Sequence, residues 1–195
     1  MTCLNKYDIR TQNKKDAIIN AALILFKEKG YTNVSINEIA SISGISTVSI
    51  YNYFNNKEGL VTECTNILMK DSIQMIRDLL DKKMDFKEKL LQIVSMCFDT
   101  HKQLLGEYFS PEALNDKVLM NLYGENVNKI RMDILMELIQ LGKEDGAIEP
   151  SISTQSIMEY INAITEKQLS WEATSNHKKK GLELFHLLLY GLIGR

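Results

Sequence analysis

Short polar and aromatic side chains gather in the stretch STVSIYNYF, residues 46–54. Hydroxyl and amide groups can hydrogen-bond to base edges and phosphates, and small apolar groups can contact the methyl of thymine. If the stretch is helical, Ile50 and Phe54 lie four residues apart and face inward together. The groups left to point outward belong to Thr47, Ser49, Tyr51, Asn52 and Tyr53. This chemistry suits hydrogen bonding to a nucleic acid. Pairs of short helices joined by a tight turn, however, also occur in all-α proteins that never bind DNA.

Patterns for catalysis or metal binding are weak in this sequence. Cys97 and His101 are four residues apart, so a helix would place both on one face, where they could contact a soft metal. Two ligands are too few for a stable site, and a small buried thiol beside a polar tip is the simpler explanation. No glycine-rich phosphate loop and no nucleophile with a neighbouring base is recognisable. We therefore expect no enzyme activity, no metal and no cofactor.

The polar stretch lies within a predicted helical corner. Ser35 and Glu38 fit the Ser-x-x-Glu capping box, which satisfies the free N–H groups of a first helical turn. Gly44 can take the left-handed conformation that ends a helix, and Ser46 can cap the next helix two residues later. A turn this short forces a large crossing angle. The spacing therefore predicts a helix-turn-helix whose second helix can enter a DNA major groove.

These residues resemble the N-terminal DNA-binding domain of the tetracycline-repressor (TetR) family. The resemblance covers about Lys14 to Leu60 and rests on Gly30-Tyr31, Ser35, Ile39-Ala40, Gly44-Ile45-Ser46, Ile50-Tyr51, Tyr53-Phe54 and Lys57-Glu58. It implies that Lys57 lies against the DNA backbone. Val48 departs from the family pattern, which often has Gly or another small residue there, and this bears on which bases are read. The predicted DNA-binding residues are Ser35, Ser46, Thr47, Val48, Ser49, Tyr51, Asn52, Tyr53 and Lys57.

The resemblance also implies a function. It points to a one-component transcriptional regulator, usually a repressor, that binds a palindromic double-stranded DNA operator as a homodimer and is released by a small-molecule effector. The predicted recognition helix, however, carries no Lys or Arg. A small-molecule-binding helical protein with a vestigial DNA head is therefore the alternative. Lys14 and Lys15 could approach phosphate, but we favour a solvated helix end for them.

Charge and composition limit the binding partners and the cellular location that the sequence allows. Residues 1–60 contain seven Lys and Arg against five Asp and Glu, and residues 61–195 contain sixteen against twenty. A mildly basic head on an acidic body fits a head that meets phosphates, although the asymmetry is small. The N-terminal residues do not form a signal-like segment, and no run is long enough to span a bilayer. With three widely spaced cysteines, these features predict a cytoplasmic protein with reduced thiols and no membrane partner.

The hydrophobic periodicity predicts an all-α fold of about nine helices. Residues 1–58 would form the three-helix DNA-binding domain, and residues 59–195 a helical domain for effector binding and dimerisation. Residues 1–12 are expected to fray. The predicted helices outside the corner are 13–29, 56–80, 85–105, 112–123, 124–143, 154–173 and 178–193.

Methionines and aromatic residues are spread over the second domain. Methionine is flexible and lines adaptable pockets well, although such residues at helical spacing are more often ordinary core. The resemblance places an effector pocket among the helices between residues 56 and 143, sometimes covered by the next helix. Few charged residues face inward, so a mainly apolar or aromatic ligand is expected. The pocket candidates are Phe98, His101, Tyr108, Phe109, Tyr123, Met132, Met136 and Trp171.

The last predicted helix, residues 178–193, is apolar nearly all round. Its own domain cannot cover every side of such a helix, so it needs a second surface. Pairing with a twofold mate, together with the preceding helix, would form a four-helix interface. The alternative is a helix that simply fills the domain core. The predicted interface residues are Leu169, Leu184, Leu187, Leu188 and Gly191.

Overall fold

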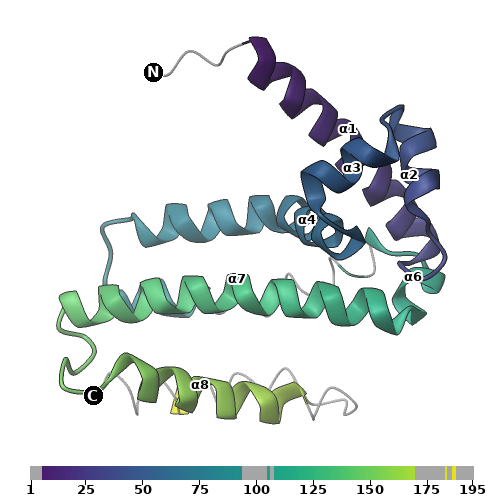
Figure 1. Cartoon of the computed structure of the whole chain (residues 1–195). Coiled ribbons are helices and arrows are strands. Elements are labelled where there is room, and N and C mark those ends of the chain that lie inside the picture. The colour runs from purple at the N-terminus through teal and green to yellow at the C-terminus, as the bar shows by residue number, and fades with distance from the viewer. Residues whose placement is uncertain (1–5, 94–104, 106–107, 170–182, 184–185, 188–195) are drawn as a thin grey trace. The chain divides into compact units, whose positions relative to one another are not determined.

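The computed structural model describes residues 6–93, 105, 108–169, 183 and 186–187 (Figure 1). Within these residues every regular element is a helix, which confirms the predicted all-α class. Residues 86–93 are also helical. The remaining helices are α1 (Lys6–Lys29), α2 (Ile36–Ser43), α3 (Thr47–Phe54), α4 (Lys57–Leu80), α6 (Pro111–Asn115), α7 (Lys117–Glu144) and α8 (Thr154–Leu169).

The chain folds into two compact units. The first combines residues 1–73 with 101–129, and the second combines residues 74–100 with 130–195. Both α4 and α7 therefore contribute residues to each unit. The predicted division of function between residues 1–58 and 59–195 stays a prediction.

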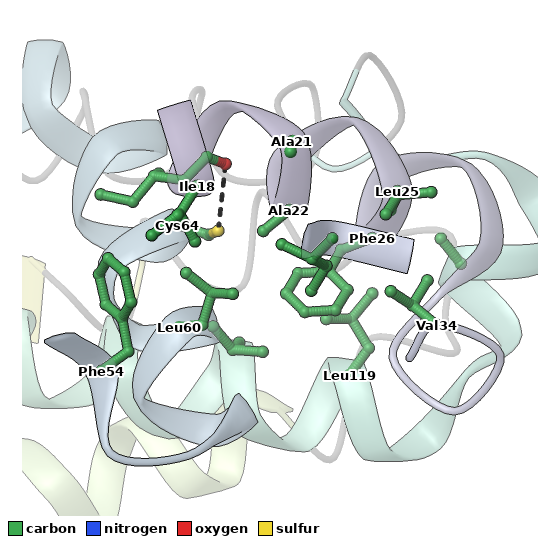
Figure 2. Close-up of a cluster of buried hydrophobic side chains, with 14 of the residues drawn as sticks. Ile18, Ala21, Ala22, Leu25, Phe26, Val34, Phe54, Leu60, Cys64 and Leu119 are labelled. Carbon is green, nitrogen blue, oxygen red and sulfur yellow. Dashed lines mark hydrogen bonds between the residues drawn. The ribbon is translucent and has the colours of Figure 1, made fainter. Parts of the chain in front are cut away.

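The core of the first unit is built on one face of α1. Ile18, Ala22 and Phe26 recur at helical spacing and are almost completely buried. Ile50 of α3 and Leu60 of α4 complete the same apolar cluster, which also takes in residues of α2, α6 and α7 (Figure 2). Because such buried residues leave cavities when truncated, each large-to-small change here costs about 2–5 kcal/mol. This core fixes the orientation of α3.

The second unit has its own core. Ile76 and Leu80 from the end of α4 pack with Phe86, with Leu138 of α7 and with Ile157 of α8. These apolar side chains leave less than a tenth of their surface exposed. The unit is thus held together by a separate hydrophobic cluster rather than by an extension of the first.

Helix α1 begins earlier than predicted. It starts at Lys6, whereas the sequence pattern placed its start near Asn13 and expected residues 1–12 to fray. Asp8 lies in the first turn, where a negative charge interacts favourably with the helix dipole. The Gln12 side-chain amide also donates to the Asp16 carboxylate at 2.8 Å, one turn further along. Polar pairs of this kind extend the helix without any apolar stripe.

The boundary between α6 and α7 was also predicted wrongly. We expected one helix over 112–123 and the next over 124–143, with the break at Gly124. The break lies at Asp116 instead, and Gly124 continues α7. The Asp116 carboxylate accepts hydrogen bonds from the N–H groups of Val118 and Leu119, both at 3.0 Å, and so caps α7. A good N-cap therefore determines the boundary, and an interior glycine is tolerated.

The C-terminal prediction falls mostly outside the described residues. In the region of the predicted last helix, the structure describes positions 183, 186 and 187, all helical. Leu187 is 64% exposed in the single chain. The side chain of Leu169 and all of Leu184, Leu188 and Gly191 lie outside the described residues. No described helix is long and apolar enough to cross a membrane.

Candidate DNA-binding site and neighbouring cavity

Helix α2 starts with the predicted capping box. The Ser35 hydroxyl accepts from the N–H of Glu38 at 3.2 Å, and the Glu38 carboxylate accepts from the N–H of Ser35 at 2.8 Å. Glu38 also forms an ion pair with Lys29 at 3.2 Å. The hydrogen bonds from Ser35 and Lys29 lower the pKa of the Glu38 carboxyl group. The box therefore places the start of α2 against the end of α1.

The turn between α2 and α3 also follows the sequence prediction. Gly44 has φ +70° and ends α2 in the left-handed region. A Cβ there would meet nothing within 4 Å, so the backbone conformation and not crowding favours glycine. The Ser46 hydroxyl then accepts from the N–H of Ser49 at 3.3 Å and caps α3. A short turn of this kind joins the two helices of a helix-turn-helix.

Helix α3 presents one buried face and one exposed face. Ile50 and Phe54 are 1% and 6% exposed and fix the helix to the core. Val48 and Tyr51 are 67% and 50% exposed, although both carry large apolar groups. Asn52 and the cap Ser46 are exposed as well, while Thr47, Ser49 and Tyr53 are half-buried. The exposed face offers an amide, a phenol and an isopropyl group, which suit contacts in a major groove.

A basic residue that the sequence interpretation assigned to a solvated helix end lies beside this helix. The Lys15 ammonium, on α1, lies 5.8 Å from the ring centroid of Tyr53 on α3. It thus supplies a positive charge next to a helix that has none of its own. Residues 15 and 53 are distant in the chain, so only the packing of α1 on α3 could have revealed the pair.

Lys57 is held inside the head. Its ammonium donates to the backbone carbonyl of Tyr31 and lies 3.9 Å from the Tyr31 ring centroid. The Tyr31 hydroxyl donates to the Glu58 carboxylate at 2.6 Å. Burial, followed by this bond to Glu58, raises the pKa of Tyr31 to about 12, and desolvation lowers the pKa of Lys57. These contacts join α4 to the loop after α1, and a phosphate contact by Lys57 stays a prediction.

The end of α1 is fastened by a residue far along the chain. The N–H of Ser110 donates to the carbonyl of Lys27 at 2.8 Å, and its hydroxyl donates to the carbonyl of Glu28 at 2.6 Å. Both carbonyls belong to the last turn of α1, where no intrahelical donor remains for them. The segment that leads into α6 therefore caps α1.

Asp116 makes a second connection at the same place. Its carboxylate, which caps α7, also accepts from the N–H of Thr32 at 2.6 Å. A Cβ on Gly30 would lie 2.7 Å from this carboxylate, and Gly30 has φ +77°. Partial burial of Asp116 opposes ionisation, but the hydrogen bonds from Thr32, Leu119 and Val118 lower the pKa of its carboxyl group.

Replacement of Asp116 by alanine is expected to destabilise the chain by about 1–2 kcal/mol at neutral pH, because the cap of α7 is lost. Folding lowers the pKa of this carboxyl group. Its contribution to folding stability is therefore present at pH values above its pKa in the unfolded chain, about 3.9, and is lost as the pH falls through its pKa in the folded chain. Urea unfolding measures the free energy of unfolding of Asp116→Ala and of the parent chain. The difference between the two should therefore be large at pH 7 and small at about pH 2.5. Asp133→Ala, at an exposed aspartate of α7, is the control and should differ little at either pH.

A cavity of about 210 Å³ lies within the first unit. Three predicted pocket residues, Tyr108, Phe109 and Tyr123, line it. Met132 is half-buried and Met136 is 47% exposed, and neither lines the cavity. Phe98, His101 and Trp171 lie outside the described residues. The other lining residues, none of which was among the predicted pocket residues, are Leu23, Ile24, Phe26, Lys27, Val61, Cys64, Thr65, Leu68 and Leu119.

The described residues contain no group of three or more His, Cys, Asp or Glu that could hold a metal. Cys97 and His101 both lie outside this set. Cys64 is buried, its thiol donates to the carbonyl of Ile19 at 3.9 Å, and burial raises its pKa (Figure 2). A neutral buried thiol of this kind acts as a small apolar side chain.

Comparison with known proteins identifies the helix-turn-helix. Residues 18–64 match the family model described as "Bacterial regulatory proteins, tetR family". The HTH-type transcriptional repressor KstR2 of Mycolicibacterium smegmatis is 22% identical over 163 residues, which cover 82% of this chain and 79% of KstR2.

Solved structures agree over nearly the whole length. The fatty acid degradation regulator FadR from Bacillus halodurans is 26% identical, with a TM-score of 0.53 and coverage of 91% of this chain and 98% of that one. FadR from Bacillus subtilis, solved in complex with stearoyl-CoA, is 21% identical, with a TM-score of 0.57 and the same coverage. The relatives regulate transcription and are not enzymes. Residues 18–64 of this protein accordingly form a helix-turn-helix domain of the kind found in bacterial regulatory proteins of the tetR family.

Proposed function

We propose that this protein is a cytoplasmic repressor that binds a palindromic operator as a homodimer and leaves it when a small, mainly apolar or aromatic effector binds. The observation that carries the proposal is the exposed face of α3, on which Val48, Tyr51 and Asn52 stand free of the core. Large apolar groups this exposed on a rigid, capped helix are expected where a partner covers them. In a twofold dimer, two such helices would enter major grooves one helical turn apart, ~34–36 Å.

Lys15 is proposed as a phosphate contact that compensates for the uncharged recognition helix. Fluorescence anisotropy with DNA from upstream of the gene, measured across a range of salt concentrations, tests this. Each phosphate contact contributes about 0.9 to the slope of log affinity against log salt. Because a dimer carries two copies of residue 15, Lys15→Ala should reduce the magnitude of that slope by about 2. The control is Lys129→Ala, at an exposed lysine of α7, which should keep the slope of the parent protein. Equal slopes for the parent, Lys15→Ala and Lys129→Ala proteins would mean that Lys15 does not contact phosphate.

The dimer is proposed to form through the C-terminal helices. Among the predicted interface residues, Leu187 is the one whose side chain lies within the described part of the chain. An apolar side chain that is 64% exposed in one chain suits a surface covered by a second copy. Leu187→Glu would bury charges at that surface and should weaken dimerisation at least tenfold, about 1.4 kcal/mol. Sedimentation velocity should show monomers at concentrations where the parent chain and Ile152→Glu, at another exposed apolar residue, stay dimeric. An unchanged dimer would place the interface elsewhere.

The proposed effector is smaller than the molecule bound by one structural relative. FadR of Bacillus subtilis was solved with stearoyl-CoA, whose acyl chain has three times as many carbons as benzene. A cavity of ~150 Å³ suffices for benzene, so 210 Å³ is too small for the whole acyl chain. Effector release requires a ligand that prefers the conformation with lower DNA affinity, with a coupling free energy of about 1–3 kcal/mol.

A small-molecule-binding protein with a vestigial DNA head is the second candidate. The absence of Lys and Arg from α3 favours it. The salt titration described for Lys15 separates the two functions, because a vestigial head would show neither a steep salt slope nor a preference for upstream DNA over unrelated DNA.

A further inference from the structure

We infer that the cavity walled by α1, α4 and the start of α7 binds a small aromatic carboxylate, with its ring on the apolar floor and its carboxylate beside Lys27. All described residues that line this cavity belong to the first unit. The binding itself is independent of DNA recognition. The regulatory consequence, that binding releases DNA, rests on the proposed function.

The floor of the cavity is apolar and requires no polar partner. Phe26 and Val61 are 2% exposed and Tyr123 is 5% exposed. The Thr65 hydroxyl donates to the carbonyl of Val61 at 2.9 Å, and the Cys64 thiol bonds to the backbone of α1. Because these polar groups are already satisfied inside the protein, the floor favours a hydrocarbon over a polar molecule.

Size and ring geometry favour an aromatic body. An apolar cavity of ~150 Å³ is large enough for benzene, so 210 Å³ accommodates one ring with a short substituent. Phe109 and Tyr123 already form an edge-to-face pair in the wall, with ring centroids 5.6 Å apart and planes at 78°. A further ring can pack against such a pair with its edges and faces matched, a preference that an alkyl chain lacks.

The mouth of the cavity differs from the floor because it is exposed and positively charged. Ile24 and Tyr108 are 51% and 37% exposed, and Lys27 is exposed between them in the lining. The Lys27 ammonium lies 6.0 Å from the Tyr108 ring centroid. Within the described residues it takes part in no ion pair. A ligand carboxylate at the mouth would therefore meet a cation without displacing an existing acidic partner.

The position of the cavity connects the ligand to the DNA head. Leu23, Phe26 and Lys27 belong to α1, whose inner face holds α2 and α3. The carbonyls that end α1 are bonded to Ser110, next to Phe109 in the opposite wall segment. A ligand that widens the gap between α1 and α4 would therefore move α1, and α3 with it, without any relay through the second unit.

Isothermal titration of the full chain with 3-phenylpropionate tests the site, with 3-phenylpropan-1-ol as the uncharged match. Both should bind, and the acid about fivefold more tightly, which corresponds to about 1 kcal/mol for an exposed ion pair. Lys27→Met keeps the apolar stem and should abolish the preference for the acid. Lys70→Met, at an exposed lysine of α4, should preserve it.

Filling the cavity locates the bound ring. Leu68→Trp and Leu23→Phe each add volume at the lining and should weaken both ligands at least tenfold, with folding checked by circular dichroism. If either variant fails to fold, the Lys27→Met comparison decides. Absence of binding at millimolar ligand, unchanged binding in folded filled variants, or equal affinity for acid and alcohol would each overturn the inference. Operator binding without ligand is measured separately, so failure of this site leaves the DNA-binding proposal standing.

Discussion

Replacement of Gly59 by alanine is expected to destabilise the corner between α3 and α4 by about 3 kcal/mol. Gly59 lies in the first turn of α4, and a Cβ there would overlap the backbone carbonyl oxygen of Phe54, the last residue of α3. A clash with backbone cannot be relieved by a side-chain rotation, so the cost lies at the upper end for overpacking. The corner is already tight, since the N–H of Asn56 donates to that same carbonyl at 2.7 Å.

For a chain of this length, such a loss should lower the melting temperature by about 6–12 °C. Thermal unfolding followed by circular dichroism measures it. Gly124→Ala is the matched control, because a Cβ at that interior position of α7 meets nothing within 4 Å. It should stabilise the chain by about 0.5–1 kcal/mol. A Gly59→Ala protein as stable as the parent would mean that α3 and α4 do not meet as closely as the structure shows.

Substitutions on the exposed face of α3 should lower operator affinity without changing stability. Asn52→Ala removes an amide that can pair with adenine and should cost about 10–100-fold, or about 1–3 kcal/mol. Tyr51→Ala, at a residue that is 50% exposed, removes a phenol and its ring and should cost about tenfold. Neither side chain is buried, so melting temperatures should stay within the small range typical of surface changes.

The control is Tyr160→Ala on α8, since Tyr160 is 45% exposed and differs from Tyr51 mainly in location. It should retain full affinity in the same anisotropy assay. If Tyr51→Ala and Asn52→Ala also retain full affinity while the parent binds its operator, another face of the head contacts the bases.

Features governed by neighbouring residues could be predicted from the sequence. The capping box at Ser35 and the left-handed Gly44 depend on interactions within four residues, and the structure contains both. The inward positions of Ile50 and Phe54 follow in the same way from helical spacing. These local signals were sufficient to define the fold class and the position of helix α3.

Features that depend on distant contacts were missed. The bond from Thr32 to the Asp116 carboxylate spans 84 residues and has no local signal, whereas the start of α7 was misplaced because Gly124 was weighted above the local cap at Asp116. Lys15 was assigned to solvent because its partner, Tyr53, lies on another helix. The cavity was missed in part because most of its α1 wall, formed by Leu23, Ile24 and Lys27, lies off the buried apolar stripe of that helix. Periodicity identifies which face is buried but does not identify what that face contacts.

Whether α3 reads bases in a major groove is tested by sequencing the DNA that the intact protein selects from a random duplex library. We expect one enriched palindrome whose half-sites are centred about 10 base pairs, or a multiple of that distance, apart. Val48→Ala, at the most exposed apolar residue of α3, should change the preferred base within each half-site. No enrichment over the starting library, or an identical motif selected by the parent and Val48→Ala proteins, would show that α3 does not read bases.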